Sequence, residues 1–197
     1  MTKPISISLL ALTCTLIATP ALAGFDQIVG ALNPQACGGQ GCWTNHMRIT
    51  DIDGDGDLDL ILVNYADFFT ATNNAQPLVI YQNDGNGNFT NVSTAALQDH
   101  AGNHHQIAVG DVDGDGSRDI YAPSGNGSAH FLFINDGAGL FLDEAEVRLP
   151  TDYPKGGAAR MGDVDNDGDL DIVVSDGYGG GAPPFAHLYI NDGTGMF

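Results

Sequence analysis

Three stretches of this chain carry carboxylates at a spacing that suits a metal ion. Each has the pattern D-x-D-x-D-G-x-x-D, and the three begin at residues 51, 111 and 163. Carboxylates at positions 1, 3, 5 and 9 meet at one point only if the backbone curls around it, and the glycine at position 6 permits that curl. Such oxygen donors, with a backbone carbonyl from position 7, are the ligands that Ca²⁺ prefers. The pattern therefore predicts up to three calcium sites.

Position 12 separates this pattern from other calcium motifs. An EF-hand needs a bidentate glutamate at position 12 and helices on both sides. Position 12 is Leu62, Ala122 or Val174 here, and the flanking runs are typical of strands. Tandem nonapeptide calcium repeats would need the pattern G-G-x-G-x-D, which the chain lacks. The Asp loops are therefore expected to connect β-strands.

A second motif repeats in step with the Asp loops. It has the pattern N-D-G-x-G-x-F and occupies residues 83–89, 135–141 and 191–197. Asn, Asp and Gly tolerate positive φ, so each copy is expected to form the turn of a β-hairpin. Each repeat then consists of a strand, the Asp loop, two more strands, the turn and a fourth strand. Beyond the N-terminus, no segment shows the apolar period of a helix.

The repeating strands predict the fold class, which is all-β. Four antiparallel strands per repeat are typical of a β-propeller blade. The repeats cover about residues 25–88, 89–140 and 141–197, and residues 24–28 resemble the start of a fourth strand at 88–92. Propellers have about four to eight blades, so three are too few to close a ring. We therefore expect a fragment of a larger, about seven-bladed ring, or one of several chains that share it.

The first 23 residues have the features of a secretory signal peptide. Lys3 supplies the basic start, an apolar run follows, and residues 21–23 form an A-x-A cleavage site. A membrane anchor is the alternative, but the apolar run ends at Pro20 and is too short to span a bilayer. We expect residues 24–197 to carry no membrane span and to be secreted, periplasmic or at the cell surface.

The cysteines predict a disulfide, and the net charge of the chain excludes some classes of partner. Cys37 and Cys42 remain after signal cleavage, and in an oxidising compartment they are expected to form a disulfide around a Gly-rich segment. Two free thiols are the alternative, and a zinc site would need further ligands. The formal net charge is −19. So acidic a chain is not expected to bind nucleic acid or an anionic membrane.

Together the Asp loops and the N-D-G turns resemble FG-GAP/VCBS-type repeats, the blades of integrin-alpha-like β-propellers. The resemblance extends over almost all of residues 24–197, and Ala122-Pro123 stands where that family has Gly-Ala-Pro. The Phe-Gly part of the family name is not evident, so the bacterial VCBS form is the closer match. The resemblance implies that each Asp loop joins the first two strands of a blade and binds Ca²⁺. The implied ligands are the carboxylates of Asp51, Asp53, Asp55, Asp59, Asp111, Asp113, Asp115, Asp119, Asp163, Asp165, Asp167 and Asp171, and the backbone carbonyls of Asp57, Ser117 and Asp169.

The same resemblance places the first strand of each blade innermost and suggests a ligand face. His46, His104 and His105 lie just before the expected first strands of two repeats, so they would lie near the ring face opposite the Asp loops. A cluster there could bind a ligand or a transition metal, and ordinary polar loop residues are the alternative. Trp43 would lie near the same face, where it could stack on a ligand or cover the disulfide.

The expected function depends both on the Asp loops and on the absence of catalytic motifs from the sequence. No serine has the G-x-S-x-G context of a nucleophile, and no Gly-rich phosphate loop precedes a helix. We expect an exported, non-catalytic scaffold for adhesion or for a protein or glycan ligand, in which Ca²⁺ stabilises the blade hairpins. The alternative is the propeller portion of a secreted polysaccharide lyase or hydrolase whose catalytic residues lie outside this chain, because the fold alone does not decide.

Overall fold

The computed structural model describes residue 32 and residues 42–66, 75–98, 100–125, 129–151, 156–176 and 186–197. The expected signal peptide, the segment at 24–28 and Cys37 lie outside these residues. Within the described residues the fold is all-β, as predicted: two four-stranded sheets and one three-stranded sheet, in which every pair of neighbouring strands is antiparallel.

Each sheet consists of strands that follow one another in the chain, and each strand pairs with the next. The first sheet contains β1 (Cys42–Thr50), β2 (Asp59–Ala66), β3 (Val79–Asn83) and β4 (Phe89–Asn91). The second contains β5 (Ala108–Gly110), β6 (Asp119–Ala122), β7 (Phe131–Asn135) and β8 (Phe141–Asp143). The third contains β9 (Gly156–Gly162), β10 (Asp171–Asp176) and β11 (Ala186–Tyr189).

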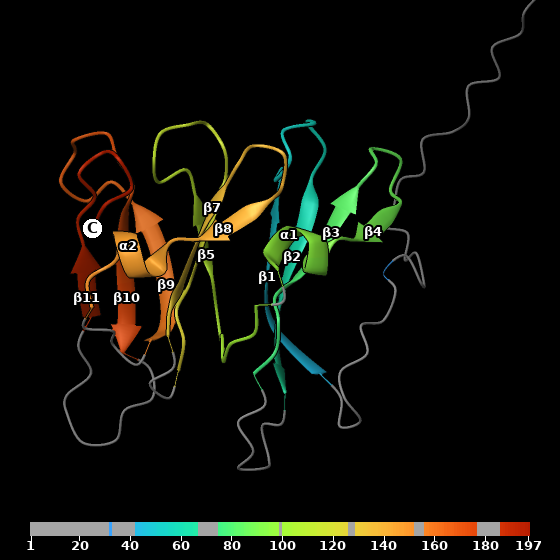
Figure 1. The fold of residues 1–197 in the computed structure, drawn as a ribbon, viewed down its shortest axis with the longest axis horizontal. Coiled ribbons are helices and arrows are strands. Elements are labelled where there is room, and N and C mark those ends of the chain that lie inside the picture. Colours follow the sequence, from blue (N-terminus) through green and yellow to red (C-terminus); the bar gives the residue numbers. More distant parts are fainter. Residues whose placement is uncertain are drawn as a thin grey trace, which may run out of the picture.

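The predicted loops fall where the sequence placed them. The three Asp loops join β1 to β2, β5 to β6 and β9 to β10. The N-D-G motifs form the turns after β3, β7 and β11, and each turn is closed by the same backbone hydrogen bond, from Asp84 N to Asn88 O (3.1 Å) in the first copy. Figure 1 shows the Asp loops and the N-D-G turns along one edge of the molecule. This edge is called the loop edge below.

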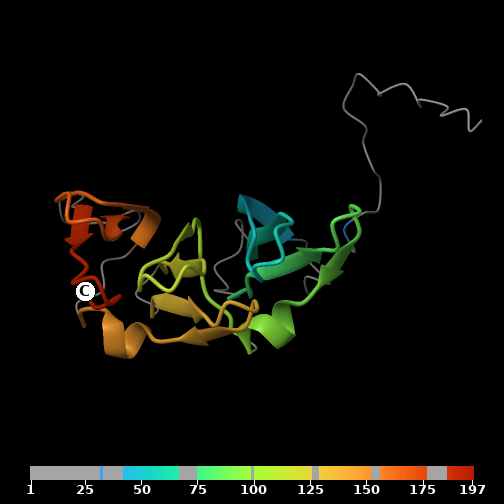
Figure 2. The same ribbon diagram turned by 90° about the horizontal axis from the view of Figure 1, so that it is seen from above.

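The three sheets stand side by side in an open arc, which is plain when the molecule is seen from above (Figure 2). Two apolar layers hold them together. The first layer lies between the first and second sheets and includes Ile61, Ile80 and Phe133, each at most 1% exposed. The second layer lies between the second and third sheets and includes Tyr121 and Ile172, which are fully buried. The sheets therefore pack face to face, as the blades of a propeller do.

Two short helices were not predicted. α1 (Ser93–Leu97) follows β4, and α2 (Ala145–Arg148) follows β8, so each leads from the last strand of one sheet toward the next sheet. Helices of one turn are too short to show a 3.6-residue apolar period, so no periodic pattern in the sequence predicts them. Ala96 and Leu97 of α1 are buried in the first apolar layer, so packing stabilises the helix rather than propensity. No helix among the described residues is long and apolar enough to cross a membrane.

Candidate metal centres

The Asp loops owe their shape to residues at positions 4 and 6. Both positions adopt positive φ in all three copies, and Asn166 is the only one of these residues that is not glycine, with φ of 65°. Asparagine tolerates this left-handed conformation better than other residues with a side chain. These two left-handed residues, separated by one position, turn the backbone inward, as the predicted loop requires.

The aspartate at position 1 fastens this curl. In the first loop the carboxylate of Asp51 accepts hydrogen bonds from Gly54 N (2.8 Å) and Gly56 N (3.0 Å). Asp111 and Asp163 accept the equivalent pairs in the other two loops. Each loop therefore holds its own conformation through backbone N–H groups, and the remaining lone pairs of the carboxylates stay available to a cation.

The aspartate at position 9 is completely buried in every copy. Asp59 accepts hydrogen bonds from Ile52 N and Asn83 N, both at 2.9 Å, and so joins its loop to the third strand of its own sheet. Asp119 and Asp171 make the same pair of contacts. Burial raises the pKa of Asp119 to about 6 against the lowering effect of these hydrogen bonds. A cation beside this group would favour its charged form.

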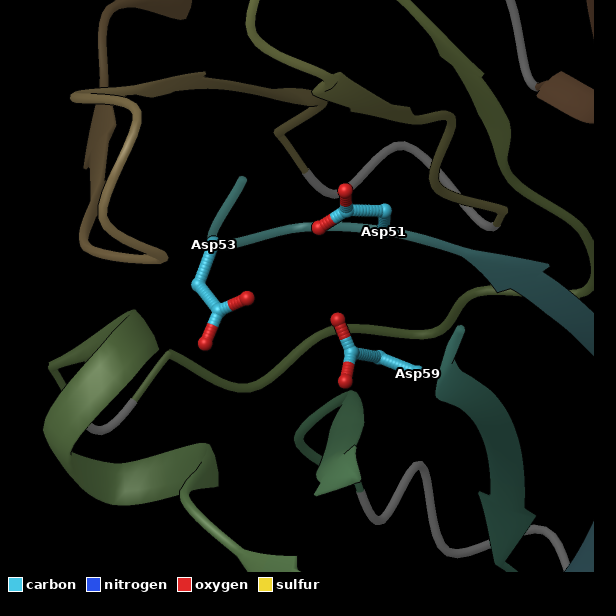
Figure 3. Close-up of side chains that lie close together, drawn as sticks. All are labelled: Asp51, Asp53 and Asp59. Atoms are coloured by element: carbon cyan, nitrogen blue, oxygen red, sulfur yellow. The ribbon is translucent and has the colours of Figure 1, made fainter. Parts of the chain in front are cut away.

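Carboxylates converge in each loop to a distance that one ion can bridge. Figure 3 shows the side chains of Asp51, Asp53 and Asp59 around a common space. One oxygen from each of these residues lies within 4.8 Å of the others. Two oxygens that bind the same Ca²⁺ at about 2.4 Å are at most about 4.8 Å apart, so the donors fit this ion. The corresponding sets are Asp111, Asp113 and Asp115 in the second loop and Asp163, Asp165 and Asp171 in the third.

These sets contain part of the predicted ligand list. Asp55, Asp119 and Asp167 are not members of them. The carboxylates of Asp55 and Asp167 accept a hydrogen bond from the backbone N–H two residues later, as does that of Asp115, which is a member of its set. Asp119 lies beneath the second loop, where it holds backbone groups.

One buried carboxylate oxygen in the second loop makes no hydrogen bond with the described residues. Asp113 Oδ1 is shielded from solvent and makes no hydrogen bond, whereas Oδ2 of the same carboxylate lies 3.6 Å from Arg148 Nη2. An unpartnered buried carboxylate oxygen costs free energy unless a cation or donor meets it. Because Asp113 belongs to the converging set of its loop, this oxygen fits a calcium ligand.

The side chain at position 7 points away from the carboxylate set. A Cβ built on Gly85 would lie 2.3 Å from Asp57 Oδ2, and a Cβ on Gly193 would lie 2.6 Å from Asp169 Oδ2. Ser117 stands in the same relation to Gly137, at 3.1 Å. Position 7 thus packs on the N-D-G turn of its own sheet. This placement agrees with the expectation that position 7 offers a backbone carbonyl rather than its side chain.

The asparagine of the N-D-G motif is a functional residue that the sequence did not reveal as one. Asn135 in the second sheet donates from Nδ2 to Ile52 O of the first sheet (2.7 Å) and to Arg118 O of its own sheet (3.1 Å). Asn191 repeats this bridge to Val112 O and Leu170 O, at the same two distances. The acceptor across each sheet boundary is the carbonyl of position 2 in the neighbouring Asp loop. We call this contact the asparagine bridge.

The expected ligand face is only partly present as an accessible surface. His104 is 2% exposed; its Nδ1 lies 3.1 Å from Pro123 O, and its ring packs edge-on against Phe131. Burial lowers the pKa of His104 to about 4. His46 lies inside β1 rather than before it, and its Nδ1 accepts a hydrogen bond from Ile107 N (3.3 Å). His105 is half-buried.

Two further predicted residues are described only in part. Cys42 and Trp43 form the start of β1, paired with Ala66 and Tyr65, and nothing is described of their side chains. The predicted disulfide between Cys37 and Cys42 therefore stays a prediction, because Cys37 lies outside the described residues.

A cleft of about 340 Å³ opens on the loop edge between the first and second sheets. Its walls combine carboxylate, hydroxyl, guanidinium and apolar groups, including Asp51, Leu58, Ser117 and Arg118. Asp51 belongs to the converging set of the first loop, so the cleft adjoins a candidate metal centre.

The chain was compared with known proteins. The sequence model of the FG-GAP-like repeat family matches residues 51–122 and again residues 119–174. The two matches together cover more than half of the chain; the first includes the first two Asp loops, and the second includes the third. No curated protein matches the chain. The repeat matches, the antiparallel sheets and the Asp loops agree, and the chain belongs to the FG-GAP-like repeat family.

Proposed function

We propose that this protein is an exported, non-catalytic binding scaffold of propeller blades whose three Asp loops each bind a Ca²⁺ ion. The observation that carries the proposal is the convergence of three carboxylates in every loop to within 4.8 Å. Carboxylates brought this close repel one another unless a cation neutralises them. Hard oxygen donors favour Ca²⁺ over transition metals.

The ion would act on stability rather than on a reaction. Asp59 receives hydrogen bonds from the loop and from β3, and Asn135 donates to Ile52 O in the same loop. An ion that orders the first loop would therefore also stabilise the hairpin of β1 and β2 and the contact between the first and second sheets. In this role the carboxylates hold the loop shape, and the protein uses the ordered loop edge for contact with a partner.

A protein or glycan partner would meet the loop edge at the cleft between the first and second sheets. The cleft offers the exposed Arg118 and the hydroxyl of Ser117 beside Asp51, a mixture that suits hydroxyl- or carboxylate-bearing ligands. His46 and His105 stay candidates on the inner strands, whereas contact through His104 would require it to leave its buried position. No observation on the described residues favours the enzyme alternative.

Export and the disulfide between Cys37 and Cys42 form part of the same proposal. The basic, apolar and A-x-A segments at residues 1–23 support export. Calcium-binding loops also suit an extracellular setting, where the ion is abundant.

Calorimetric titration with Ca²⁺ tests the proposal. The protein is expected to bind three ions, and Asp53→Ala, Asp113→Ala and Asp165→Ala are each expected to remove one of them. Asp84→Ala, in the exposed N-D-G turn after β3, is the matched control and should leave three. Binding of no Ca²⁺ by the folded protein, shown by circular dichroism, would refute the proposal.

A further inference from the structure

The aspartate at position 3 has a polar partner from outside its loop in each of the first two Asp loops. Asp53 Oδ2 accepts a hydrogen bond from Gln82 Nε2 in β3, at 2.7 Å. Asp113 Oδ2 lies 3.6 Å from Nη2 of Arg148, the last residue of α2. Both aspartates belong to the converging sets of their loops. A neutral amide therefore meets the first candidate metal centre, and a cation meets the second.

The amide and the guanidinium occupy equivalent places in the molecule. A Cβ built on Gly139, in the N-D-G turn of the second sheet, would lie 3.5 Å from Gln82 Nε2. A Cβ built on Gly195, the equivalent glycine of the third sheet, would lie 2.6 Å from Arg148 Nη1. These two Cβ positions would also lie 3.4 and 3.1 Å from the Cβ of the position-3 aspartate in the preceding loop. Each polar group thus lies between an Asp loop and the N-D-G turn of the following sheet.

The sequence exchanges these two partners between the first and second repeats. Ile134 stands at the position of Gln82, one residue before the Asn of the N-D-G motif, and its side chain offers no hydrogen bond. Ala96 of α1 stands at the position of Arg148, seven residues after the Phe of the motif. Of these two positions, each repeat therefore has one polar residue, which is neutral in the first repeat and positively charged in the second.

Arg148 is held beside Asp113 by further contacts. Its Nε donates a hydrogen bond to Glu144 Oε2, and its Nη1 donates to Thr194 O at 2.6 Å. The side chains of Arg148 and Asp113 are only 16% and 17% exposed, so water screens the charge of this pair less than it screens a surface pair. Glu144 offsets part of the positive charge, but the guanidinium still faces a carboxylate of the second loop.

The second loop also carries less negative charge than the first before Arg148 is counted. Residues 51–59 include five carboxylates and no basic side chain, whereas residues 111–119 include four carboxylates and the exposed Arg118. The number of charged groups is one of the properties by which calcium loops set their affinity. Both the composition of the second loop and its contact with Arg148 therefore oppose the binding of a cation.

We propose that Arg148 sets the calcium affinity of the second Asp loop, and that this loop binds Ca²⁺ more weakly than the first. The proposal deepens the proposed function and rests on it. Arg148 faces one oxygen of Asp113 and leaves the other, Oδ1, to a calcium ion. Its positive charge repels that ion, and it also neutralises part of the loop when no ion is bound. As the calcium concentration rises, the first loop fills before the second.

Calorimetric titration with Ca²⁺ in proteins that retain one site tests the proposal. Asp53→Ala combined with Asp165→Ala leaves only the second loop. In this background Arg148→Gln is expected to tighten binding about tenfold, because it removes a positive charge near the ion, and Arg148→Lys to change it less than about threefold. Arg160→Gln, which removes an exposed cation bonded to Gln106, is the matched control and should leave the affinity unchanged. An affinity that Arg148→Gln leaves unchanged or weakens overturns the proposal.

The reverse exchange tests the same idea in the first loop, with Arg148 intact. Asp113→Ala combined with Asp165→Ala leaves only the first loop, which is expected to bind Ca²⁺ more tightly than the second loop does in its own background. Gln82→Lys places a cation beside Asp53 and is expected to weaken binding about tenfold, whereas Gln82→Met adds no charge and should change it less than about threefold. Equal affinities for the Lys and Met variants, or tighter binding by the second loop, overturn the proposal.

The dependence on salt distinguishes a charge effect from a structural role of Arg148. The difference in affinity between Arg148→Gln and its parent is expected to shrink as salt is added, because salt screens the guanidinium. A difference that salt does not change overturns the electrostatic role. If the folded, unsubstituted protein binds no Ca²⁺, the proposed function is wrong and this proposal with it. If the protein binds Ca²⁺ and Arg148→Gln does not tighten the second site, only the role of Arg148 is wrong.

Discussion

At the scale of single residues, the position-9 aspartates support the fold more than any other side chains of the Asp loops. Asp119 is fully buried and accepts hydrogen bonds from Val112 N and Asn135 N. Its removal would leave two buried N–H donors without an acceptor. An unsatisfied buried donor costs about 1–3 kcal/mol.

We therefore expect Asp119→Ala to lower the free energy of unfolding by about 2–5 kcal/mol even without Ca²⁺. Asp115→Ala changes an exposed member of the same loop and should cost less than about 1 kcal/mol under the same conditions. Urea denaturation in the presence of a chelator measures both. Equal losses for the two variants would show that the buried hydrogen bonds contribute nothing beyond metal binding.

His104 predicts an acid-side loss of stability. Burial lowers its folded pKa from 6.5 to about 4. Between these two pH values the unfolded chain binds a proton that the folded chain does not, so stability decreases as pH falls from about 6.5 to 4. The full effect of this residue is about 3 kcal/mol.

His104→Gln should accordingly flatten the pH dependence of the unfolding free energy across this range. His187→Gln, at a half-buried histidine in β11, serves as the control. Denaturation at several pH values, compared between the variants, measures the difference. A slope identical to that of the unsubstituted protein would show that the His104 ring does not titrate differently on unfolding.

At the scale of the elements, the asparagine bridge joins sheets that are far apart in sequence. Asn135 is 1% exposed and donates to carbonyls of two sheets, and its Oδ1 accepts from Gly137 N and Gly139 N of its own turn. One side chain thus shapes a turn and holds a sheet boundary.

Asn135→Ala is expected to lower the free energy of unfolding by about 2–4 kcal/mol, since it leaves buried carbonyl and N–H groups unpaired. Asn83→Ala removes the same residue from the first copy of the motif, where Nδ2 donates only to Leu58 O of its own sheet among the described residues, and should cost less than about 1 kcal/mol. Thermal melts at low protein concentration compare the two. A cost for Asn83→Ala as large as that for Asn135→Ala would contradict the bridging role.

Local features of the fold were predictable from the sequence, and long-range ones were not. The Asp loops and N-D-G turns follow from backbone preferences of Asp, Asn and Gly within a few residues. The Asn135 bridge depends on a carbonyl 83 positions away, and any residue at position 52 supplies a carbonyl, so no pattern marks it. The burial of His104 beneath Phe131 likewise results from tertiary packing. α2 was not predicted because a helix of one turn is too short to show an apolar period of 3.6 residues.

At the scale of the whole molecule, the candidate ions and the net charge of −19 act together. Charge of one sign destabilises a compact state, and ligands that bind only the folded state stabilise it. Calcium at about 1,000 times its dissociation constant would contribute about 4 kcal/mol per site.

Chelation with EDTA is therefore expected to lower the melting temperature by several degrees in a cooperative transition, and added Ca²⁺ should restore it. The combined variant Asp53→Ala, Asp113→Ala and Asp165→Ala should melt at the same temperature with and without EDTA. Differential scanning calorimetry measures these shifts. If EDTA leaves the melting temperature of the unsubstituted protein unchanged, bound calcium does not contribute to its stability.

The asparagine bridge also bears on how such molecules change size over evolution. Its donor is a side chain inside one repeat, and its acceptor is a main-chain carbonyl that any residue provides. A duplicated gene segment that encodes one repeat therefore carries both the donor for the preceding unit and the acceptor for the following one. Tandem duplication or loss of a repeat then yields a compatible neighbour at once, with no compensating substitution needed at the new junction.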